Sequence, residues 1–585
     1  MDGPAARGGL LDADKGWRRH RIDGGSDLIG QRLLALFQLG LEVRARLCQV
    51  NPLDSSEDRL EGRIVGGARR VDDGLAFEHG VVEGGLAIVG LWSLLALGFR
   101  GRGDHARAFR GPAGAPVLCS EAFGGQTTLG LDPDIPDHAE NAEDPLARSR
   151  VGRALRDKLR GGTAEIAVVG LGYVGLPLAV LLGHAGFRVH GIDADPERAS
   201  LANAGSSYIG DVATSELAQL AKSGQFSAAT TFEAASRADA ILVCVPTPLR
   251  KSREPDISFV LSAFESLMPW LRRGQLLVLE STTYPGTTED VLLPKIEEKG
   301  FTVGQDFFLA FSPERVDPGN ASFTTATIPK VVGGVTRACT EMAAALYATC
   351  TAQVHRVSSP RVAETAKLLE NTFRSVNIAL ANELALACRA LGVNPWEVIA
   401  AAATKPFGFM PFYPGPGTGG HCVPLDPLYL SWTVRLKGFE PRFIALADEI
   451  NRFMPRHAVT LVMDALNERG KCLQGAELLV LGVTYKRDVS DVRESPALEI
   501  MQMLASRGGR VSYADPFVSQ LVVGDLKLAS QPVTPDTLRR ADCVVIATDH
   551  RAFDYPVIAR EAPLVVDLRN ALGHIRDHRD NIVTL

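Results

Sequence analysis

The feature that most constrains the fold is a short apolar segment that runs directly into a glycine-rich turn and then into a helical pattern. Residues 165–169 (EIAVV) are typical of a buried strand, the turn is Gly170-Leu171-Gly172-Tyr173-Val174-Gly175, and residues 176–185 follow as a helix. These glycines permit a tight turn and let a pyrophosphate approach the backbone at the helix N-terminus. A second strand at 187–192 ends in Asp193, whose carboxylate can bind a ribose 2′-hydroxyl and would repel a 2′-phosphate. The pattern predicts a Rossmann-like unit that binds NAD in preference to NADP.

Two further strand segments of this region end in small polar residues. Residues 240–245 run into Pro246-Thr247-Pro248, and residues 276–280 run into Ser281-Thr282-Thr283. Ligands of open α/β sheets bind at the carboxyl ends of the strands. We therefore assign Thr247 to the cofactor site, together with Arg198 from the helix that follows the second strand.

One of the nine cysteines stands in an unusual setting. The run Gly415-Pro416-Gly417-Thr418-Gly419-Gly420-His421-Cys422-Val423 predicts a glycine-rich loop that few side chains crowd, and Asp426 follows the sulfur by four residues. Glycines let backbone N–H groups approach a ligand, and a cysteine in such a loop is placed to act as a nucleophile. A buried structural thiol is the alternative for an isolated cysteine. The glycine run and the carboxylate favour the nucleophile.

A long helical pattern occupies the middle of the chain. Ser359-Pro360 is typical of an N-cap followed by proline at the first helical position, and the pattern continues from Arg361 to about Leu391. Glu364, Lys367 and Asn371 are spaced so that they share one face of this helix. They form either a solvated salt-bridge stripe or a buried functional group, and periodicity alone leaves both interpretations open.

A second doubly wound unit is predicted near the C-terminus. Residues 477–483 form a strand pattern that meets a polar turn, Thr484–Asp488, instead of a glycine fingerprint. The remaining elements expected in this unit are a helix at 496–506 and strands at 510–514, 543–547 and 564–566. Lys486, Arg487 and Arg493 cluster near the end of the first of these strands, which suits a second polyanion such as a nucleotide diphosphate. A charged surface loop is the alternative.

The first 150 residues differ from the rest of the chain. They hold seventeen arginines and one lysine, with abundant glycine and poor apolar periodicity, which is typical of disorder. The uncharged run at 84–99 is sixteen residues long, shorter than the ~20 residues that a membrane-spanning helix needs. After Met1 the next methionine is Met268, so an over-extended reading frame is a second explanation. We expect residues 1–150 to be a disordered extension or not part of the native protein.

Composition excludes several classes of protein. A formal net charge of −6 and a hydrophobic fraction of 46% are typical of a globular protein without a nucleic-acid partner. The cysteines form no CxxC pairs and have no histidines at metal-ligand spacing, so neither a metal site nor a disulfide framework is expected. This usage fits a reducing cytoplasm, and no signal peptide is evident. We predict a cytoplasmic protein that does not associate with membranes.

From about Glu165 to Leu572 the chain resembles the UDP-glucose/GDP-mannose dehydrogenase family. The motifs that carry the resemblance are the GLGYVG turn, the helix with Glu364, Lys367 and Asn371, the GGHCVPLD loop around Cys422, and Tyr485-Lys486 through Asp491-x-Arg493-Glu494-Ser495. Residues 405–417 are more similar to the branch that acts on UDP-N-acetylhexosamines, in particular the UDP-N-acetylglucosamine 6-dehydrogenase type. The resemblance implies NAD-dependent oxidation of C6 of a UDP-sugar to a carboxylate, for surface polysaccharide synthesis. The implied fold is α/β, with two Rossmann-like doubly wound domains joined by a long central helix that forms a homodimer.

The same resemblance implies roles at the reacting carbon. Cys422 would form a thiohemiacetal with the aldehyde, and its oxidation would give a thioester that water cleaves. Lys367 would stabilise the developing oxyanion, and Asn371 would donate a hydrogen bond to it or to the water. Asp426 would position water or act as base, and Thr282 falls where the family holds a water or the reacting oxygen.

Binding roles are implied as well. The glycine loop would wrap the sugar and the diphosphate, Lys486 would meet the nucleotide, and Arg493 would meet the cofactor or a phosphate. The substrate-binding residues expected on this basis are Tyr413, Gly415, Gly417, Gly419, Gly420 and Lys486.

The chain departs from the family pattern at the general base. Members that act on UDP-glucose carry a catalytic glutamate a few residues after a Ser-Pro-Glu motif. Here that motif is Ser312-Pro313-Glu314, and the matching later position is Pro318. Glu314 is the candidate substitute, and the departure argues against UDP-glucose as the substrate.

The resulting organisation has four parts. They are an extension at 1–150, an NAD-binding Rossmann domain at 151–357, a central helical dimerisation region with the cysteine loop at 358–465, and a UDP-sugar-binding Rossmann-like domain at 466–585. UDP-N-acetylglucosamine leads as substrate, followed by UDP-N-acetylmannosamine and then by UDP-glucose or GDP-mannose. A one-hydride hydroxyacid dehydrogenase shares the first unit but needs neither Cys422 nor the second unit. A non-catalytic scaffold that binds sugar nucleotides is the remaining alternative.

Overall fold

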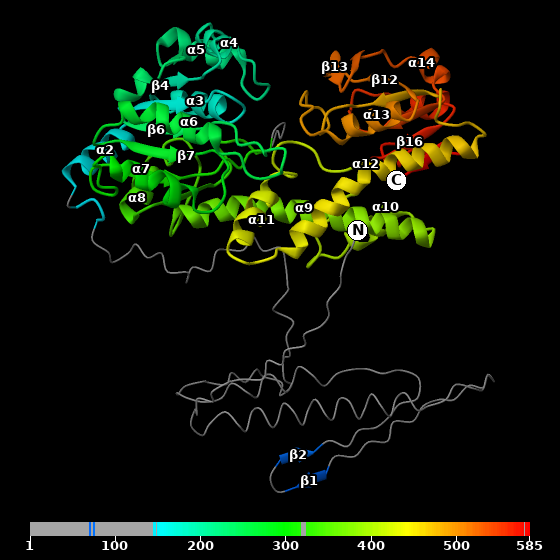
Figure 1. The fold of residues 1–585 in the computed structure, drawn as a ribbon, viewed down its shortest axis with the longest axis horizontal. Coiled ribbons are helices and arrows are strands. Elements are labelled where there is room, and N and C mark those ends of the chain that lie inside the picture. Colours follow the sequence, from blue (N-terminus) through cyan, green and yellow to red (C-terminus); the bar gives the residue numbers. More distant parts are fainter. Residues whose placement is uncertain (1–68, 72–73, 77–143, 148, 318–322, 578) are drawn as a thin grey trace, which may run out of the picture. The chain divides into compact units, whose positions relative to one another are not determined.

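In this computed structural model the described residues are 69–71, 74–76, 144–147, 149–317, 323–577 and 579–585 (Figure 1). The chain divides into two compact units, Met1–Pro116 and Val117–Leu585. In the first unit, β1 (Arg69–Val71) and β2 (Gly74–Ala76) pair antiparallel. The apolar run at 84–99 and nearly all of the extension predicted at 1–150 lie outside the described residues. No helix among the described residues is long and apolar enough to cross a membrane.

The first sheet of the second unit has eight strands in the order β10-β9-β8-β7-β6-β3-β4-β5, all parallel to their neighbours except where β8 meets β9. The strands are β3 (Glu165–Val169), β4 (Arg188–Ile192), β5 (Phe226–Ala229), β6 (Ala240–Val243), β7 (Leu276–Leu279), β8 (Phe308–Phe311), β9 (Lys330–Gly334) and β10 (Val354–Val357). The chain extends the sheet from β3 first toward β5 and then, through β6, in the other direction. Ligands of open α/β sheets bind at such a switch point.

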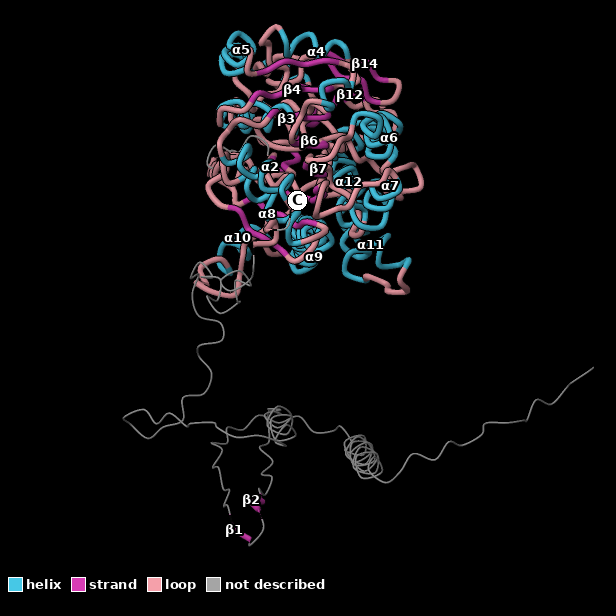
Figure 2. Tube along the Cα trace, turned by 90° about the vertical axis from the view of Figure 1, so that its left-hand side faces the viewer, coloured by secondary structure: helices cyan, strands magenta, loops and turns pink. Residues whose placement is uncertain are grey.

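The central strands of this sheet are apolar on both faces, as parallel strands covered by helices require. In β3, Ile166 and Val168 belong to one core cluster, and Ala167 and Val169 belong to another. Figure 2 shows α2 and α8 on the side of the strands opposite to α6 and α7. The helical elements of this part are α2 (Arg150–Arg160), α3 (Gly175–His184), α4 (Pro196–Asn203), α5 (Thr214–Ser223), η1 (Phe232–Ser236), α6 (Ser258–Leu267), η2 (Met268–Trp270), η3 (Thr287–Leu292), α7 (Leu293–Glu298) and α8 (Arg337–Tyr347).

The predicted central helix is confirmed as α9 (Pro360–Leu391). The hydroxyl of Ser359 accepts a hydrogen bond from the N–H of Val362, Pro360 takes the first helical position, and Gly392 ends the helix at φ = +70°. The other helices of this region are α10 (Pro395–Ala402), α11 (Asp426–Leu436) and α12 (Arg442–Glu468). α9 packs along α12 and against β9. α12 also packs against α13 (Pro496–Ser506) of the second sheet unit, so these helices contact both sheet units.

The second sheet has five parallel strands in the order β12-β11-β15-β16-β17. Its elements are β11 (Glu477–Leu481), α13 (Pro496–Ser506), β12 (Arg510–Ala514), the hairpin β13 (Gln520–Val523) and β14 (Leu526–Ala529), α14 (Pro535–Arg540), β15 (Cys543–Ile546), α15 (Tyr555–Glu561), β16 (Val565–Asp567) and β17 (Ile582–Thr584). In β11, Leu478 and Val480 face one core cluster and Leu479 and Leu481 face another. The switch point lies between β11 and β15. Two Rossmann-like units joined by long helices, the predicted fold class, are therefore confirmed.

Candidate active site

The glycine turn after β3 lies at the switch point of the first sheet, and its glycines serve different purposes. Gly170 adopts φ = +88°, and a Cβ there would come 2.6 Å from the carbonyl oxygen of Cys244, which follows β6. A Cβ at Gly175 would collide with the carbonyl oxygen of Gly170. A Cβ at Gly172, in contrast, would meet no atom within 4 Å. This open cradle at the N-terminus of α3 fits the pyrophosphate of a dinucleotide.

The carboxylate of Asp193, which follows β4, is oriented by backbone groups. Its Oδ2 accepts from the N–H of Leu171 at 2.7 Å, and its Oδ1 accepts from the N–H of Asp195 at 2.9 Å. Nη1 of Arg198 on α4 lies 3.9 Å from Oδ2. The fold thus brings Asp193 and Arg198, two of the residues that the sequence assigned to the cofactor site, beside the glycine turn.

Tyr173 connects the glycine turn to the second sheet unit. Its ring is partly exposed, and the guanidinium of Arg493 lies over it at 4.7 Å from the ring centroid, which is a cation–π contact. Asp491 holds that guanidinium through an Nε–Oδ1 bond of 3.0 Å and an Nη2–Oδ2 bond of 2.6 Å. Arg493 therefore lies against the fingerprint turn although it is distant in sequence.

The loop that carries Cys422 is held by backbone hydrogen bonds at both ends. The N–H of Gly420 donates to the carbonyl oxygen of Arg493 at 3.1 Å. The N–H of Asp426 donates to the carbonyl oxygen of Cys422 at 2.9 Å, where α11 begins. The turn between the cysteine and the helix therefore keeps the thiol and the carboxylate as close neighbours.

The expectation that few side chains crowd this loop is wrong. A Cβ at Gly419 would lie 2.7 Å from the Cβ of Tyr485, and a Cβ at Gly415 would lie 2.5 Å from Nη1 of Arg569. Gly417 adopts φ = +128°, a conformation that side chains rarely tolerate. The glycines are needed because the loop packs tightly against the second sheet unit, and spacing in the sequence cannot reveal such packing.

Lys367 and Asn371 on α9 are 8% and 5% exposed, so the interpretation as a solvated stripe is wrong for these two residues. Nδ2 of Asn371 donates to Oδ2 of Asp426 at 2.6 Å. Lys367 lies close enough for its positive charge to favour the ionised forms of Asp426 and Cys422. One helix and one loop therefore bring these residues into a single cluster, in which Lys367, Asn371 and Asp426 are buried and the cysteine is partly buried.

Burial sets the protonation states in this cluster. It raises the pKa of Cys422 to about 11, with the negative charge of Asp426 adding to the rise and Lys367 opposing it. It raises the pKa of Asp426 to about 6, against the effects of Lys367 and Asn371. Burial also lowers the pKa of His421 to about 4, so this imidazole is neutral. At neutral pH the cluster holds a thiol next to an ionised carboxylate, which is the arrangement that general-base catalysis requires.

Glu364 shares the helix face but has a structural role. It is fully buried, and its carboxylate accepts from the N–H of Gly286 at 2.6 Å and from the N–H and Oγ1 of Thr288 at 3.0 and 2.8 Å. These groups begin η3, so Glu364 caps that short helix. Both carboxylate oxygens of Glu364 therefore accept hydrogen bonds from groups of the protein.

Glu314, the candidate base, is held in its ionised form. Its Oε1 accepts from the N–H groups of Arg315 and Val316 at 2.7 and 2.8 Å, and its Oε2 lies 3.6 Å from Nζ of Lys330. Burial by itself would raise the pKa of Glu314, but Lys330 and the two backbone groups outweigh it and hold the pKa below its usual value. A carboxylate of that kind is a weaker base than Asp426. Pro318, at the position of the family glutamate, lies outside the described residues.

Three further predicted site residues, Thr247, Thr282 and Val174, lie in different surroundings. The carbonyl oxygen of Thr247 accepts a hydrogen bond from the hydroxyl of Tyr429 at 2.9 Å. Thr282 is partly buried between the buried side chains of Ser281 and Thr283. Val174 precedes α3 and packs against the core of the first sheet.

Two predicted substrate residues make contacts with other parts of the protein. The ring of Tyr413 is 51% exposed and stacks on Trp396 of α10, with 5.7 Å between centroids and 12° between planes. Nζ of Lys486 lies 2.8 Å from Oδ1 of Asp317, in the segment that follows β8. In this structure Tyr413 is therefore an outer residue of the helical region, and Lys486 reaches toward the first sheet unit.

Two residues that the sequence did not single out join the site. Arg569 follows β16 and lies behind Gly415; its Nε donates to the carbonyl oxygen of Ala547 at 3.0 Å, and burial lowers its pKa to about 10. Lys330 pairs with the buried carboxylate of Glu280 at 2.7 Å. A search for charged residues after every strand would have found Arg569. Lys330 begins a strand, and only the tertiary pairing distinguishes it.

A doubly wound sheet with an open glycine cradle at its switch point, together with a partly buried thiol next to a buried carboxylate, defines an NAD-binding oxidoreductase. The chain belongs to the UDP-glucose/GDP-mannose dehydrogenase family: its NAD binding domain matches residues 164–351, its central domain 361–453 and its UDP binding domain 479–574. The resemblance seen in the sequence is thereby confirmed, and the protein is an NAD-dependent nucleotide-sugar dehydrogenase.

Known relatives agree with this assignment. The chain is 36% identical over 357 residues, 61% of this chain and 83% of the relative, to a UDP-N-acetyl-D-glucosamine 6-dehydrogenase of Pseudomonas aeruginosa. It is 35% identical over 422 residues, 70% of this chain and 93% of the relative, to a UDP-N-acetyl-D-mannosamine dehydrogenase of Methanococcus maripaludis. A solved structure of a UDP-D-ManNAc dehydrogenase from Pyrococcus horikoshii matches with a TM-score of 0.66 at 32% identity, covering 72% of this chain and 98% of that one.

Proposed function

We propose that this enzyme oxidises C6 of a UDP-N-acetylhexosamine to the carboxylate in two steps, with UDP-N-acetylglucosamine as the leading substrate. The observation that carries the proposal is the cluster of the partly buried Cys422 with the buried Asp426, Asn371 and Lys367. A single oxidation of an alcohol needs no thiol, whereas a double oxidation must retain the aldehyde between its two steps. The relatives named for UDP-N-acetylglucosamine and UDP-N-acetylmannosamine support an aminosugar substrate.

The overall reaction consumes one alcohol and one water and releases one carboxylate, two hydrides and three protons. NAD, when bound, supplies the hydride acceptor, and the residues that would hold it are the glycine turn at 170–175, Asp193, Arg198, Thr247 and Arg493. Lys367 and Asn371 stabilise negative charge on the oxygen at C6. Asp426 takes the proton of the Cys422 thiol, whose sulfur then adds to the aldehyde carbon to give a thiohemiacetal. After the second oxidation, water attacks the thioester carbon and the sulfur leaves.

The pKa values support Asp426 as the base in preference to Glu314. A base works best when its pKa lies near the working pH, and that of Asp426 is about 6. The pKa of Glu314 is lowered, and two backbone N–H groups occupy one of its oxygens. We assign Glu314 to balancing the charge of Lys330, and Thr282 to holding a water or the reacting oxygen.

Substrate binding is assigned to the face of the cysteine loop and to the second sheet unit. The expected residues are Tyr413, Gly415, Gly417, Gly419, Gly420 and Lys486, to which the structure adds the guanidinium of Arg569 behind Gly415. UDP-N-acetylmannosamine is the second candidate, because several relatives carry that name. UDP-glucose and GDP-mannose are the other substrates that the experiment below distinguishes.

We also infer that the enzyme forms a homodimer through α9. Val362, Leu369, Phe373 and Leu380 are exposed apolar residues on this helix, and their spacing of seven, four and seven residues puts them on one face. Such a stripe would be covered by a second copy of the chain. The domain boundaries at 150, 357 and 465, the cytoplasmic location and the role in surface polysaccharide synthesis stay predictions.

The test is the amount of NADH formed from a limiting sugar nucleotide, with UDP-N-acetylglucosamine, UDP-N-acetylmannosamine and UDP-glucose run in parallel. Two NADH per UDP-N-acetylglucosamine, and little NADH from the others, is the expected result. One NADH per sugar would mean that the aldehyde is released and that Cys422 lacks the assigned role. No NADH from any of the three would favour a GDP-sugar as the substrate.

A further inference from the structure

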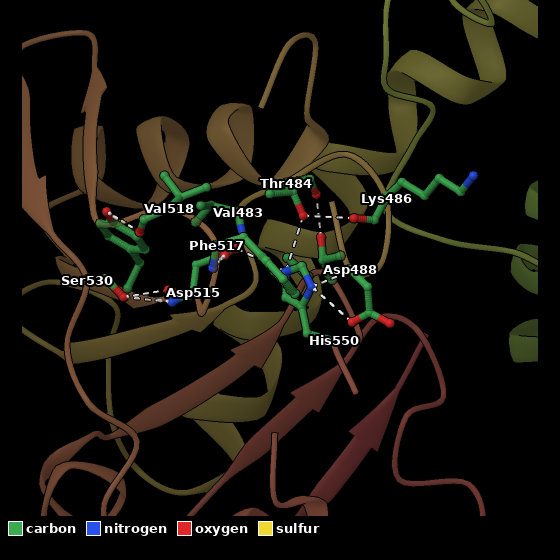
Figure 3. Close-up of polar contacts among 12 residues, drawn as sticks. Val483, Thr484, Lys486, Asp488, Asp515, Phe517, Val518, Ser530 and His550 are labelled. Carbon is green, nitrogen blue, oxygen red and sulfur yellow. Dashed lines mark hydrogen bonds and ion pairs between the residues drawn. The ribbon is translucent and has the colours of Figure 1, made fainter. Parts of the chain in front are cut away.

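At the switch point of the second sheet, a buried histidine forms the centre of a polar network. The turn Thr484–Asp488 follows β11, and residues 548–551 follow the neighbouring strand β15. Figure 3 shows His550 at the centre of the contacts between these segments. Its side chain is 0% exposed, and the proposed reaction does not use it.

The hydrogen bonds of His550 define a single tautomer. The N–H of Asp488 donates to Nδ1 at 3.0 Å, so Nδ1 carries no proton. Nε2 therefore carries the proton, and it lies 3.0 Å from Oδ2 of Asp515 and 3.2 Å from Oγ1 of Thr484. Both ring nitrogens are thus occupied, and the imidazole cannot turn without leaving a buried polar group unpaired.

This imidazole holds a backbone turn that a non-glycine residue rarely adopts. Asp488 has φ = +58°, in the left-handed region, and its N–H bond to His550 secures that conformation. Oδ1 of Asp488 also accepts from the N–H of Arg551 at 2.9 Å. On the other side of the turn, Oγ1 of Thr484 donates to the carbonyl oxygen of Lys486 at 2.9 Å. The backbone of the turn is therefore held at Lys486 and at Asp488.

The side chain of Lys486 extends away from this network, as Figure 3 shows, while its carbonyl group belongs to it. Its ammonium group reaches Asp317 at 2.8 Å. The direction of the ammonium group therefore depends on the turn, and the geometry of the turn depends on His550.

We propose that His550 is a positioning residue of the nucleotide-sugar site, which holds the Thr484–Asp488 turn so that Lys486 meets the diphosphate. This inference rests on the proposed function, which assigns Lys486 to the nucleotide. An ammonium group on a fixed turn loses less conformational freedom on binding than one on a mobile turn. Nε2 of His550 also engages Oδ2 of Asp515, which follows β12 as Asp193 follows β4. The carboxylate at this switch point is therefore not available to the ribose of a dinucleotide.

The test compares two substitutions that separate the bonds of His550. In His550→Asn the amide takes the place of Nδ1 and keeps an acceptor for the N–H of Asp488. In His550→Gln the amide takes the place of Nε2 and keeps the contact with Asp515 instead. Both variants lose one partner, so both should lower the Tm, and a merely structural role would raise KM equally in the two. KM for the sugar nucleotide, kcat and the Kd for NAD are measured for both variants and the wild type.

We expect KM for the sugar nucleotide to rise about ten-fold in His550→Gln and to stay within about two-fold in His550→Asn, with kcat and NAD affinity little changed in both. Equal KM values in the two variants, or a loss of kcat at constant KM, would overturn the assignment. If wild-type protein fails to bind UDP in calorimetry, the proposed function itself is wrong and the assignment falls with it.

A second variant covers the case in which neither histidine variant folds. Thr484→Val keeps the shape of the side chain and removes its hydroxyl, which donates to the carbonyl oxygen of Lys486 and also lies 3.2 Å from Nε2 of His550. We expect KM for the sugar nucleotide to rise about three-fold with kcat unchanged. An unchanged KM would overturn the role of the turn.

Discussion

The two sheet units have the same backbone arrangement at their switch points but treat the key carboxylate differently. In the first unit the N–H of Leu171 donates to Asp193 at 2.7 Å, and in the second the N–H of Val483 donates to Asp515 at 2.7 Å. A second backbone N–H, two residues after each carboxylate, completes the set at 2.9 and 2.8 Å. Only the second carboxylate is also covered by His550. The comparison teaches that a single side chain decides whether the carboxylate at the switch point of this fold is available to a ligand or engaged within the protein.

The residues that follow β3 and β11 show where the two turns differ. Gly170 and Gly482 occupy equivalent positions, and both are packed at positive φ, +88° and +77°, against the carbonyl oxygen of a residue that follows the neighbouring strand, so both are required for folding. Two residues further along, Gly172 leaves open space where a ligand can approach, whereas the second unit has Thr484, whose hydroxyl donates to the carbonyl oxygen of Lys486. The predictions below test this contrast and the loop that packs against the second unit.

The largest effect is expected at Cys422, the proposed nucleophile in the loop that packs against the second unit. Cys422→Ser should lower the formation of the uronic acid by about a thousand-fold or more, since a hydroxyl replaces the sulfur that retains the aldehyde. Binding of the sugar nucleotide, measured by calorimetry, should be unchanged. A variant that still forms the acid at the normal rate would rule out the thioester scheme.

The open cradle of the first unit is tested by Gly172→Ala. Because a Cβ there meets no protein atom, the variant should keep the Tm of the wild type, while the Kd for NAD rises by about a hundred-fold where the methyl group obstructs the pyrophosphate. The matched variant is Gly482→Ala, which should lower the Tm instead because of its packing and its positive φ. Equal Tm values for the two variants would contradict the distinction between an open glycine and a packed one.

The carboxylate that His550 covers in the second unit is tested by Asp515→Asn. Loss of the charged acceptor for His550 and for two backbone N–H groups should lower the free energy of unfolding by about 2 kcal/mol. Asp193→Asn, which has no buried histidine beside it, should cost less stability but weaken NAD binding. Urea unfolding and NAD titration of both variants measure the two effects, and weaker NAD binding in Asp515→Asn alone would reverse the assignment of the units.

The smallest effect is the pH dependence of the reaction at the cysteine loop. The pKa of Asp426 is about 6, so its carboxylate is ionised above that pH and becomes protonated below it. As an essential base it should make kcat fall by about ten-fold per pH unit below pH 6. A kcat profile that stays flat between pH 6 and pH 5 would exclude Asp426 and return attention to Glu314.

Most elements of the fold were predictable because each was encoded locally. The predicted helix at 496–506 and strand at 510–514 match α13 and β12, and the cap at Ser359 marks the start of α9. The continuous apolar runs of β3 and β11 follow from covering both faces of a parallel sheet. Of the predicted site, the residues of the cluster around Cys422 could be found from two local motifs, the helix face with Lys367 and Asn371 and the loop with Cys422 and Asp426. The crowding of the glycine loop could not, because it depends on Tyr485 and Arg569, which come from distant parts of the chain.

By itself, the sequence determined the two doubly wound units, the long helix between them and the presence of a cysteine in a glycine loop. These features depend on short-range periodicity, capping and turn chemistry, which neighbouring residues specify. Only the tertiary structure decided which polar groups are free to react. It assigned Glu364 to a helix cap, Asp515 to His550 and Glu314 to Lys330, and it left Asp426 with a raised pKa. The physical reason is that burial and hydrogen-bond partners set the pKa and availability of a side chain, and those partners are brought together only by folding.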